Sequence, residues 1–149
     1  MTFADTLTAA ERALLDGLDP DVRARALQHG ELCFARGIRI GFRQGYRSFA
    51  EQAALYAKGR TVNGARVTNA RPGYSWHNWR RAYDVVIEGF PGDPTPNDVY
   101  DGPWSLVGEL GELAEMDWGG RWKRPDLPHF ESPQSTLAML VRQHPQGLA

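Results

Sequence analysis

The hydrophobic positions of the first third of the chain change their period near residue 38. Helical spacing is seen for Val22, Ala26, Leu27 and Phe34. Asp19 and the proline after it are suited to the cap and the first turn of a helix, so we expect a helix over residues 20–37 with Asp19 as its cap. Residues 38–42 then alternate apolar and other side chains, which predicts a half-buried strand.

A capping box marks the next predicted element. Ser48 is followed three residues later by Glu51, a pairing that satisfies two free backbone N–H groups at a helix start. We expect a short helix from there to Gly59. Residues 60–76 are rich in Gly, Asn, Pro and Arg and predict a long loop, and a loop of that length in a small domain is more often functional than idle.

The second half of the chain mixes strands and helices without a regular alternation. Strands are expected at residues 82–87 and 127–131, and helices at residues 104–116 and 132–142, the last one starting at Ser132-Pro133. Residues 88–101 hold several Pro, Gly and Asp residues and predict an excursion on the surface. This order favours an α+β fold, and with no repeat or change of composition we expect one domain over residues 1–149.

Composition excludes several classes of function. The formal net charge of −1 gives no general basic field, so we expect no binding to nucleic acid. No apolar run approaches the roughly 20 residues of a membrane span, so we expect no membrane insertion. The single cysteine, Cys33, excludes an internal disulfide and a cysteine-cluster metal site. Residues 1–18 lack the pattern of a signal peptide, so we expect a chain that is cytoplasmic as synthesised.

Two of the four histidines are candidates for chemistry. His29 lies inside the first long helix without a clear acidic partner, and His144 follows the last helix, so both are expected to be structural or on the surface. The two candidates are therefore His77 and His129. His77 is followed by Asp84 in an otherwise apolar strand, where an unpaired carboxylate is costly. Two imidazoles and one carboxylate make a three-ligand zinc site with an open position. Each spacing alone is common, and taken alone it favours a structural role over metal binding.

Taken together, the segments resemble one family. Ser75, His77, Ala82 and Asp84, followed by Asp126 and His129, match the pattern Ser-x-His-x-x-Gly-x-Ala-x-Asp and acid-x-x-His. This pattern is typical of the VanY-like zinc peptidases of family M15, which include D-alanyl-D-alanine carboxypeptidases and the L-alanyl-D-glutamate endopeptidases of phage endolysins. Further likeness is found at residues 45–48, 58–61, 67–70 and 118–120.

The resemblance implies a fold and a role for each matching residue. The fold would be a small antiparallel sheet flanked by helices, as in Hedgehog-type and D,D-peptidase domains. Zn²⁺ would be bound by His77, Asp84 and His129. Asp126 would act as the general base and Arg47 would stabilise negative charge or bind a substrate carboxylate. Ser75 and Gln52 would bind substrate.

The resemblance also implies a substrate. We expect hydrolysis of an amide bond in peptidoglycan stem peptides, and the likeness of residues 58–79 to phage endolysins favours the L-Ala–D-Glu bond. Two alternatives remain: a D-Ala–D-Ala carboxypeptidase with the same zinc chemistry, and a binding module that keeps zinc without turnover. The protein is expected to be a monomer and to reach the cell wall after a separate release step.

Arg80 departs from the family pattern, which has glycine at this position. Glycine there would permit a positive φ or a close backbone approach. If the backbone here needs a positive φ, Arg80 would be strained. We favour the other account, in which the local turn has adapted to a right-handed conformation and Arg80 points toward solvent or the edge of the cleft.

Overall fold

A four-stranded antiparallel sheet forms the centre of the computed structural model, which describes residues 1–148. Its strands are β1 (Arg39–Gln44), β2 (Ala82–Gly89), β3 (Asp117–Trp118) and β4 (His129–Glu131). They lie in the order β1-β2-β4-β3, so β2 and β4 are the two interior strands. The predicted α+β class and the small antiparallel sheet are confirmed.

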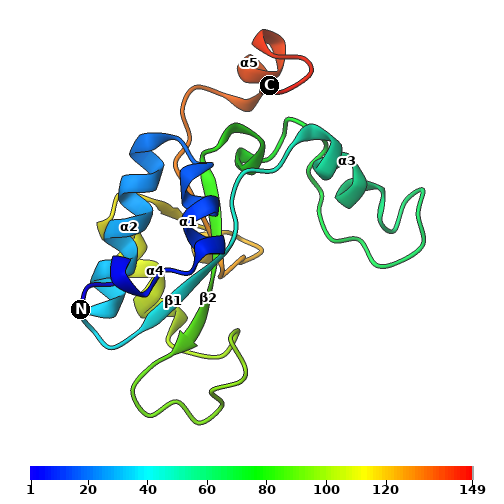
Figure 1. Ribbon diagram of the computed structural model, residues 1–149. Coiled ribbons are helices and arrows are strands. Elements are labelled where there is room, and N and C mark those ends of the chain that lie inside the picture. The colour runs from blue at the N-terminus through cyan, green and yellow to red at the C-terminus, as the bar shows by residue number, and fades with distance from the viewer. Residues whose placement is uncertain (149) are drawn as a thin grey trace.

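Helices cover one face of this sheet and leave the other accessible. The α-helices are α1 (Ala9–Asp16), α2 (Pro20–Phe34), α3 (Phe49–Ala57), α4 (Trp104–Leu113) and α5 (Leu137–Gln143). Short 3₁₀ turns are η1 (Ala4–Thr6), η2 (Trp76–Trp79) and η3 (Gly119–Arg121). Helices α1, α2 and α4 pack beside the sheet, whereas α3 with the following loop projects to the opposite side (Figure 1).

The register of β2 with β4 separates a covered face from an open face. Tyr83 lies opposite Phe130, and both side chains are fully buried in the hydrophobic core with α2 and α4. Their neighbours Asp84 and His129 also lie opposite each other, and they point to the other face because side chains alternate along a strand. The same pairing therefore builds a core on one side and a polar site on the other.

Two glycines of α4 explain how closely this helix approaches the sheet. A Cβ atom at Gly108 would lie 2.3 Å from the Trp118 ring, and one at Gly111 would lie 2.4 Å from the Phe130 ring. Both glycines lower the helix propensity of the segment. The close contact of α4 with aromatic side chains of β3 and β4 requires them.

Most predicted elements are confirmed, with differences at several ends and one helix that was not predicted. The capping box of Ser48 and Glu51 starts α3 as predicted. Asp19 makes no capping hydrogen bond to α2, and its carboxylate accepts one from Arg81 instead. The last helix begins at Leu137 with Thr136 as its cap, so the predicted start at Ser132-Pro133 is wrong. Helix α1, which has its own capping box, is not among the predicted elements.

The predicted right-handed conformation of Arg80 is wrong. Its φ of 62° and ψ of 27° are left-handed, where a residue with a Cβ is disfavoured. The side chain does not point to the cleft: its guanidinium donates to the carbonyl of Gly17 at 2.7 Å and lies 3.9 Å from the centre of the Tyr46 ring. These contacts, with the α1–α2 connection at Gly17 and with Tyr46 after β1, offset the backbone strain at the end of η2.

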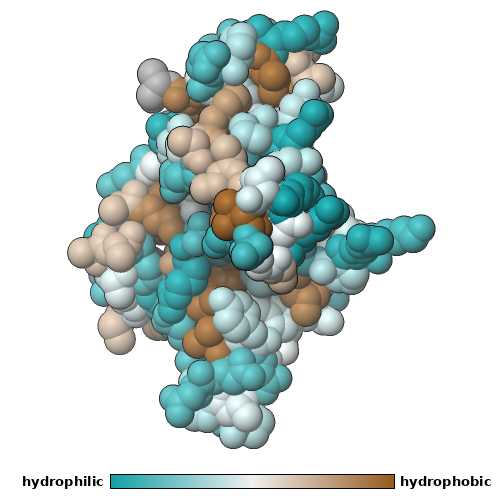
Figure 2. Space-filling view, turned by 90° about the vertical axis from the view of Figure 1, so that its right-hand side faces the viewer, coloured by the Kyte–Doolittle hydropathy of each residue, from teal (hydrophilic) through white to brown (hydrophobic). Residues whose placement is uncertain are grey.

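The surface is predominantly polar on the side toward which α3 and its loop project. Figure 2 shows hydrophilic residues over most of this side, with hydrophobic residues in separate patches. Among residues 1–148, no helix combines the length and the apolar character that crossing a membrane requires.

Candidate metal centre and catalytic cleft

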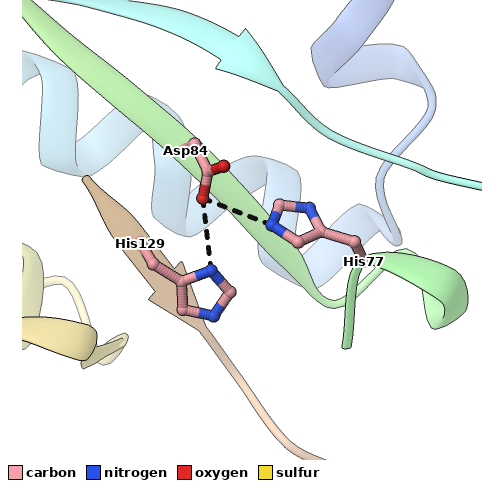
Figure 3. Close-up of side chains that lie close together, drawn as sticks. All are labelled: His77, Asp84 and His129. Carbon is pink, nitrogen blue, oxygen red and sulfur yellow. Dashed lines mark hydrogen bonds and ion pairs between the residues drawn. The ribbon is translucent and has the colours of Figure 1, made fainter. Parts of the chain in front are cut away.

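Three side chains of the open face bring one donor atom each to a common point. Asp84 Oδ1 lies 3.2 Å from His77 Nε2 and 3.2 Å from His129 Nδ1. All three atoms lie within 4.8 Å of one another, with the carboxylate between the two imidazoles (Figure 3). The structure therefore brings together the three residues for which the sequence predicts metal binding.

This donor set fits a tetrahedral zinc ion. Ligands at about 2.1 Å from zinc with tetrahedral angles lie about 3.4 Å from one another. The two distances to Asp84 Oδ1 are close to that value, and the two imidazole nitrogens lie within 4.8 Å of each other. Two imidazole nitrogens and one carboxylate oxygen are ordinary zinc ligands, and three of them leave a fourth position for water or substrate.

The three side chains come from different elements that are fixed locally. Asp84 and His129 are held opposite each other by the β2–β4 ladder. His77 lies in η2, where the Ser75 hydroxyl accepts a hydrogen bond from the His77 backbone N–H at 3.3 Å. The His77 carbonyl in turn accepts a hydrogen bond from the Arg47 N–H at 2.9 Å. Ser75 thus supports His77 through its backbone while also lining the cleft.

The far nitrogens of both imidazoles also have partners, which the sequence did not predict. His77 Nδ1 lies 2.8 Å from the Gly45 carbonyl, and His129 Nε2 lies 2.8 Å from Glu131 Oε1. Glu131 is two residues from His129 on β4 and therefore on the same face of the strand. Strand periodicity is the sequence signal that identifies it.

The charges of the cluster shift the pKa values of its members in opposite directions. Burial alone would raise the pKa of Asp84, but hydrogen bonds to His129 and His77 hold it well below its usual range. Burial would lower the pKa of His129, but Asp84 and Glu131 raise it to about 9. Without a metal, the two carboxylates therefore favour the protonated, positively charged form of His129. A bound metal ion would supply that positive charge in place of the proton.

The cluster lies in a cleft of about 630 Å³. Arg47, Ser75, Asp126 and Trp122 line the same cleft. The Trp122 ring centre is 5.1 Å from that of His129, so an aromatic side chain packs against one metal-binding candidate. A substrate in this cleft would contact a cation, a free carboxyl group and an apolar wall.

Asp126 is a carboxyl group of the cleft that lies outside the His-Asp-His cluster and, unlike Glu131, forms no ion pair with His129. Partial burial raises its pKa; the nearby histidines lower it and the charge of Asp84 raises it again. The side chain remains solvent-accessible. A carboxyl group with a raised pKa beside a metal site is well suited to accept and return a proton.

Gln52 occupies a different place from the one predicted. It is fully buried and does not line the cleft. Its amide oxygen accepts a hydrogen bond from Arg47 at 2.9 Å, and its amide nitrogen donates to the Ala70 carbonyl at 2.7 Å. Direct substrate contact by Gln52 is therefore wrong for this structure: Gln52 fixes Arg47 and the loop of residues 60–76.

Arg47 is the cation of the cleft. Burial lowers its pKa, while the charges of Asp84 and Glu51 raise it. Within residues 1–148 no carboxylate forms an ion pair with it at 4.0 Å or less. Its guanidinium is therefore held by Gln52 and remains available to an anionic group of a ligand.

The other candidates behave as predicted. His29 is fully buried between Tyr83 and the Val107 carbonyl, so its role is structural. His144 is exposed beyond the end of α5. Cys33 is buried and free.

The fold and this site are those of the D-alanyl-D-alanine carboxypeptidase family. A VanY-type D-alanyl-D-alanine carboxypeptidase profile matches residues 16–92, and an M15-type profile with the same description matches residues 68–132. The first match spans half of the chain. The chain belongs to the VanY-like family of D-alanyl-D-alanine carboxypeptidases.

One curated relative is similar over about two thirds of the chain. The chain is 40% identical over 103 residues to the peptidoglycan L-alanyl-D-glutamate endopeptidase CwlK of Bacillus subtilis strain 168. That match covers 64% of this chain, and the chain spans 62% of the relative's length.

Two solved structures share the fold. The L-Ala D-Glu endopeptidase ChiX of Serratia marcescens has a TM-score of 0.57 at 22% identity, covering 93% of this chain and 92% of that one. The LD-carboxypeptidase LdcB has a TM-score of 0.56 at 18% identity, covering 85% of this chain and 71% of that one. At these identities the likeness shows the fold alone.

Proposed function

We propose that the chain is a zinc-dependent peptidase that hydrolyses an amide bond in peptidoglycan stem peptides. The observation that carries this proposal is the meeting of His77, Asp84 and His129 at one point of a cleft. Asp126 and Arg47 line the same cleft and provide a proton acceptor and a cation. Zinc is the metal favoured by the donor set and by the family relationship.

The roles follow from the chemistry of amide hydrolysis. Zinc held by His77, Asp84 and His129 would supply a positive charge that acidifies water and polarises the scissile carbonyl. Asp126 accepts the proton of the attacking water and returns it to the nitrogen of the leaving amine. Arg47 lies where it stabilises negative charge on the substrate, either on the carbonyl oxygen or on a carboxylate.

The L-Ala–D-Glu bond is the proposed point of cleavage. Support comes from the 40% identity to an L-alanyl-D-glutamate endopeptidase and from the endolysin-like residues 58–79. The second candidate, a D-Ala–D-Ala carboxypeptidase, is favoured by the family profile that covers residues 16–92. Because stem peptides belong to the cell wall, the wall is the proposed place of action, after release from the cytoplasm.

Digestion of defined muropeptides tests the proposal. The protein is first assayed for bound zinc and then incubated with muropeptides that carry a pentapeptide stem, and the products are identified by mass spectrometry. Cleavage between L-Ala and D-Glu supports the endopeptidase, and release of the terminal D-Ala supports the carboxypeptidase. A zinc-loaded protein that cuts neither bond, in muropeptides or in whole sacculi, would refute both and leave a zinc-binding module.

A further inference from the structure

Within the part of the chain that the structure describes, the side chain of Glu131 forms one ion pair in the cleft, with His129. Its Oε1 atom lies 2.8 Å from His129 Nε2, and its side chain is only 16% exposed. Among residues 1–148, no Lys or Arg lies within ion-pair distance of it. On β2 its register partner is Ala82, whose short side chain offers it no polar contact. The carboxylate of Glu131 therefore acts mainly on the His129 ring.

A hydrogen bond to one nitrogen of an imidazole decides what the other nitrogen can do. A neutral imidazole has one N–H and one lone pair. If His129 Nε2–H donates to Glu131, the lone pair lies on Nδ1, the atom that faces Asp84. In His77 the arrangement is reversed, because Nδ1 is next to the Gly45 carbonyl and Nε2 faces Asp84.

Glu131 also fixes the orientation of the ring. A flip by 180° would exchange Nδ1 and Nε2 for the two ring carbons, and both hydrogen bonds of His129 would be lost. The Trp122 and His77 rings pack at 5.1 Å from His129 but provide no polar contact that distinguishes the two orientations. The hydrogen bond to Glu131 at the far nitrogen distinguishes them on one side of the ring, as the contact of Nδ1 with Asp84 does on the other.

We propose that Glu131 is a positioning residue for the metal centre: it selects the His129 tautomer whose Nδ1 binds the metal and holds the ring in that orientation. This inference rests on the zinc site of the proposed function. It assigns to this site two carboxylates with different tasks. Asp84 binds the metal directly, and Glu131 acts through His129 and adds a second negative charge near the cation.

Zinc affinity measured by chelator competition tests this role without reference to activity. Glu131→Ala removes the acceptor and should weaken zinc binding about 10- to 100-fold, the range typical of lost outer partners of a metal ligand. Glu131→Gln retains an acceptor oxygen but not the charge, so it should recover part of the affinity. Glu109→Ala removes an exposed carboxylate from α4 and is the matched control, with wild-type affinity expected.

The tautomer provides a second measurement. In ¹⁵N NMR spectra of the zinc-loaded wild type and of Glu131→Gln, His129 should carry its proton on Nε2.

Zinc affinity of Glu131→Ala equal to wild type, in a protein with the same melting temperature, would overturn the positioning role. If Glu131→Ala does not fold, Glu131→Gln decides: Gln affinity equal to wild type would leave no role for the charge, and a proton on Nδ1 would overturn the tautomer assignment. A wild type that binds no zinc would instead refute the metal centre.

Discussion

The two faces of the sheet each bury a histidine, and the two histidines are in opposite electrostatic environments. On the covered face, His29 packs at 4.5 Å from the Phe130 ring, with the Tyr83 hydroxyl at 2.9 Å and the Val107 carbonyl at 2.8 Å. On the open face, His129 has a carboxylate at each nitrogen. Burial lowers the pKa of His29 to about 4, whereas Asp84 and Glu131 outweigh burial and raise that of His129 to about 9.

The comparison teaches that burial alone does not identify a functional histidine. Both imidazoles are satisfied at both nitrogens, so the hydrogen-bond count does not separate them either. The partners do: the uncharged hydroxyl and carbonyl do not offset the burial that keeps His29 neutral, while carboxylates outweigh burial and attract positive charge to His129. A cluster of this second kind fits a metal ion, and the first kind fits a hydrophobic core.

The largest expected effect comes from removing the carboxylate of the open face. Asp84→Ala should abolish tight zinc binding and activity, because Asp84 Oδ1 lies within 3.2 Å of both imidazoles. Zinc content and muropeptide cleavage measure this. The matched change on the covered face, Tyr83→Phe, should retain zinc and lower the free energy of unfolding by about 1–3 kcal/mol, since it leaves His29 without a donor. Tight zinc binding by Asp84→Ala would mean that the site is assigned wrongly.

The next effect separates proton transfer from metal binding on the open face. Asp126→Asn should keep zinc and reduce kcat by about 10²- to 10⁴-fold, because the amide cannot accept the proton of the attacking water. Zinc content and steady-state kinetics on the same preparation are the measurements. Loss of zinc together with activity, in a folded variant, would make Asp126 a ligand instead.

A smaller effect concerns the pH dependence of stability on the covered face. The pKa of His29 is about 4 in the folded protein and 6.5 as an unperturbed group, so the unfolded chain binds the extra proton first as pH falls. The contribution of His29 is therefore complete above pH 6.5 and is lost toward pH 4. Between pH 7 and pH 5 it should cost the wild type about 2 kcal/mol of unfolding free energy.

His29→Gln is the variant that isolates this contribution. It keeps a polar side chain of similar reach but does not titrate in this range. Urea denaturation at pH 7 and pH 5 should give it the smaller loss of stability. An equal loss in wild type and variant would show that His29 is not the group responsible.

The smallest effect concerns Arg80, which connects η2 on the open face with the carbonyl of Gly17 on the helical side. Arg80→Ala and Arg80→Gly remove the same side-chain contacts, but only glycine is free of strain at a φ of 62°. The glycine variant should therefore be more stable than the alanine variant by about 1 kcal/mol, measured by thermal unfolding. The reverse order would indicate a right-handed turn.

Local signals in the sequence were sufficient for most of the fold. The capping box at Ser48, the β-branched strand after Asp84 and the loop of residues 60–76 depend on neighbours in the chain, and the structure has all three. The start of α5 was misplaced because Pro133 is compatible with a first helical turn but does not require one.

The sequence by itself determined the three candidate metal ligands, because the order of its motifs matches the family pattern at His77, Asp84 and His129, and these three meet in the structure. Only the tertiary structure decided how each is held. Burial of Gln52, the left-handed backbone of Arg80 and the pairing of Glu131 with His129 depend on contacts between segments far apart in the chain or on the exact register of strands. Such contacts outweigh local preference, since the packed neighbours supply the hydrogen bonds that offset strain and desolvation.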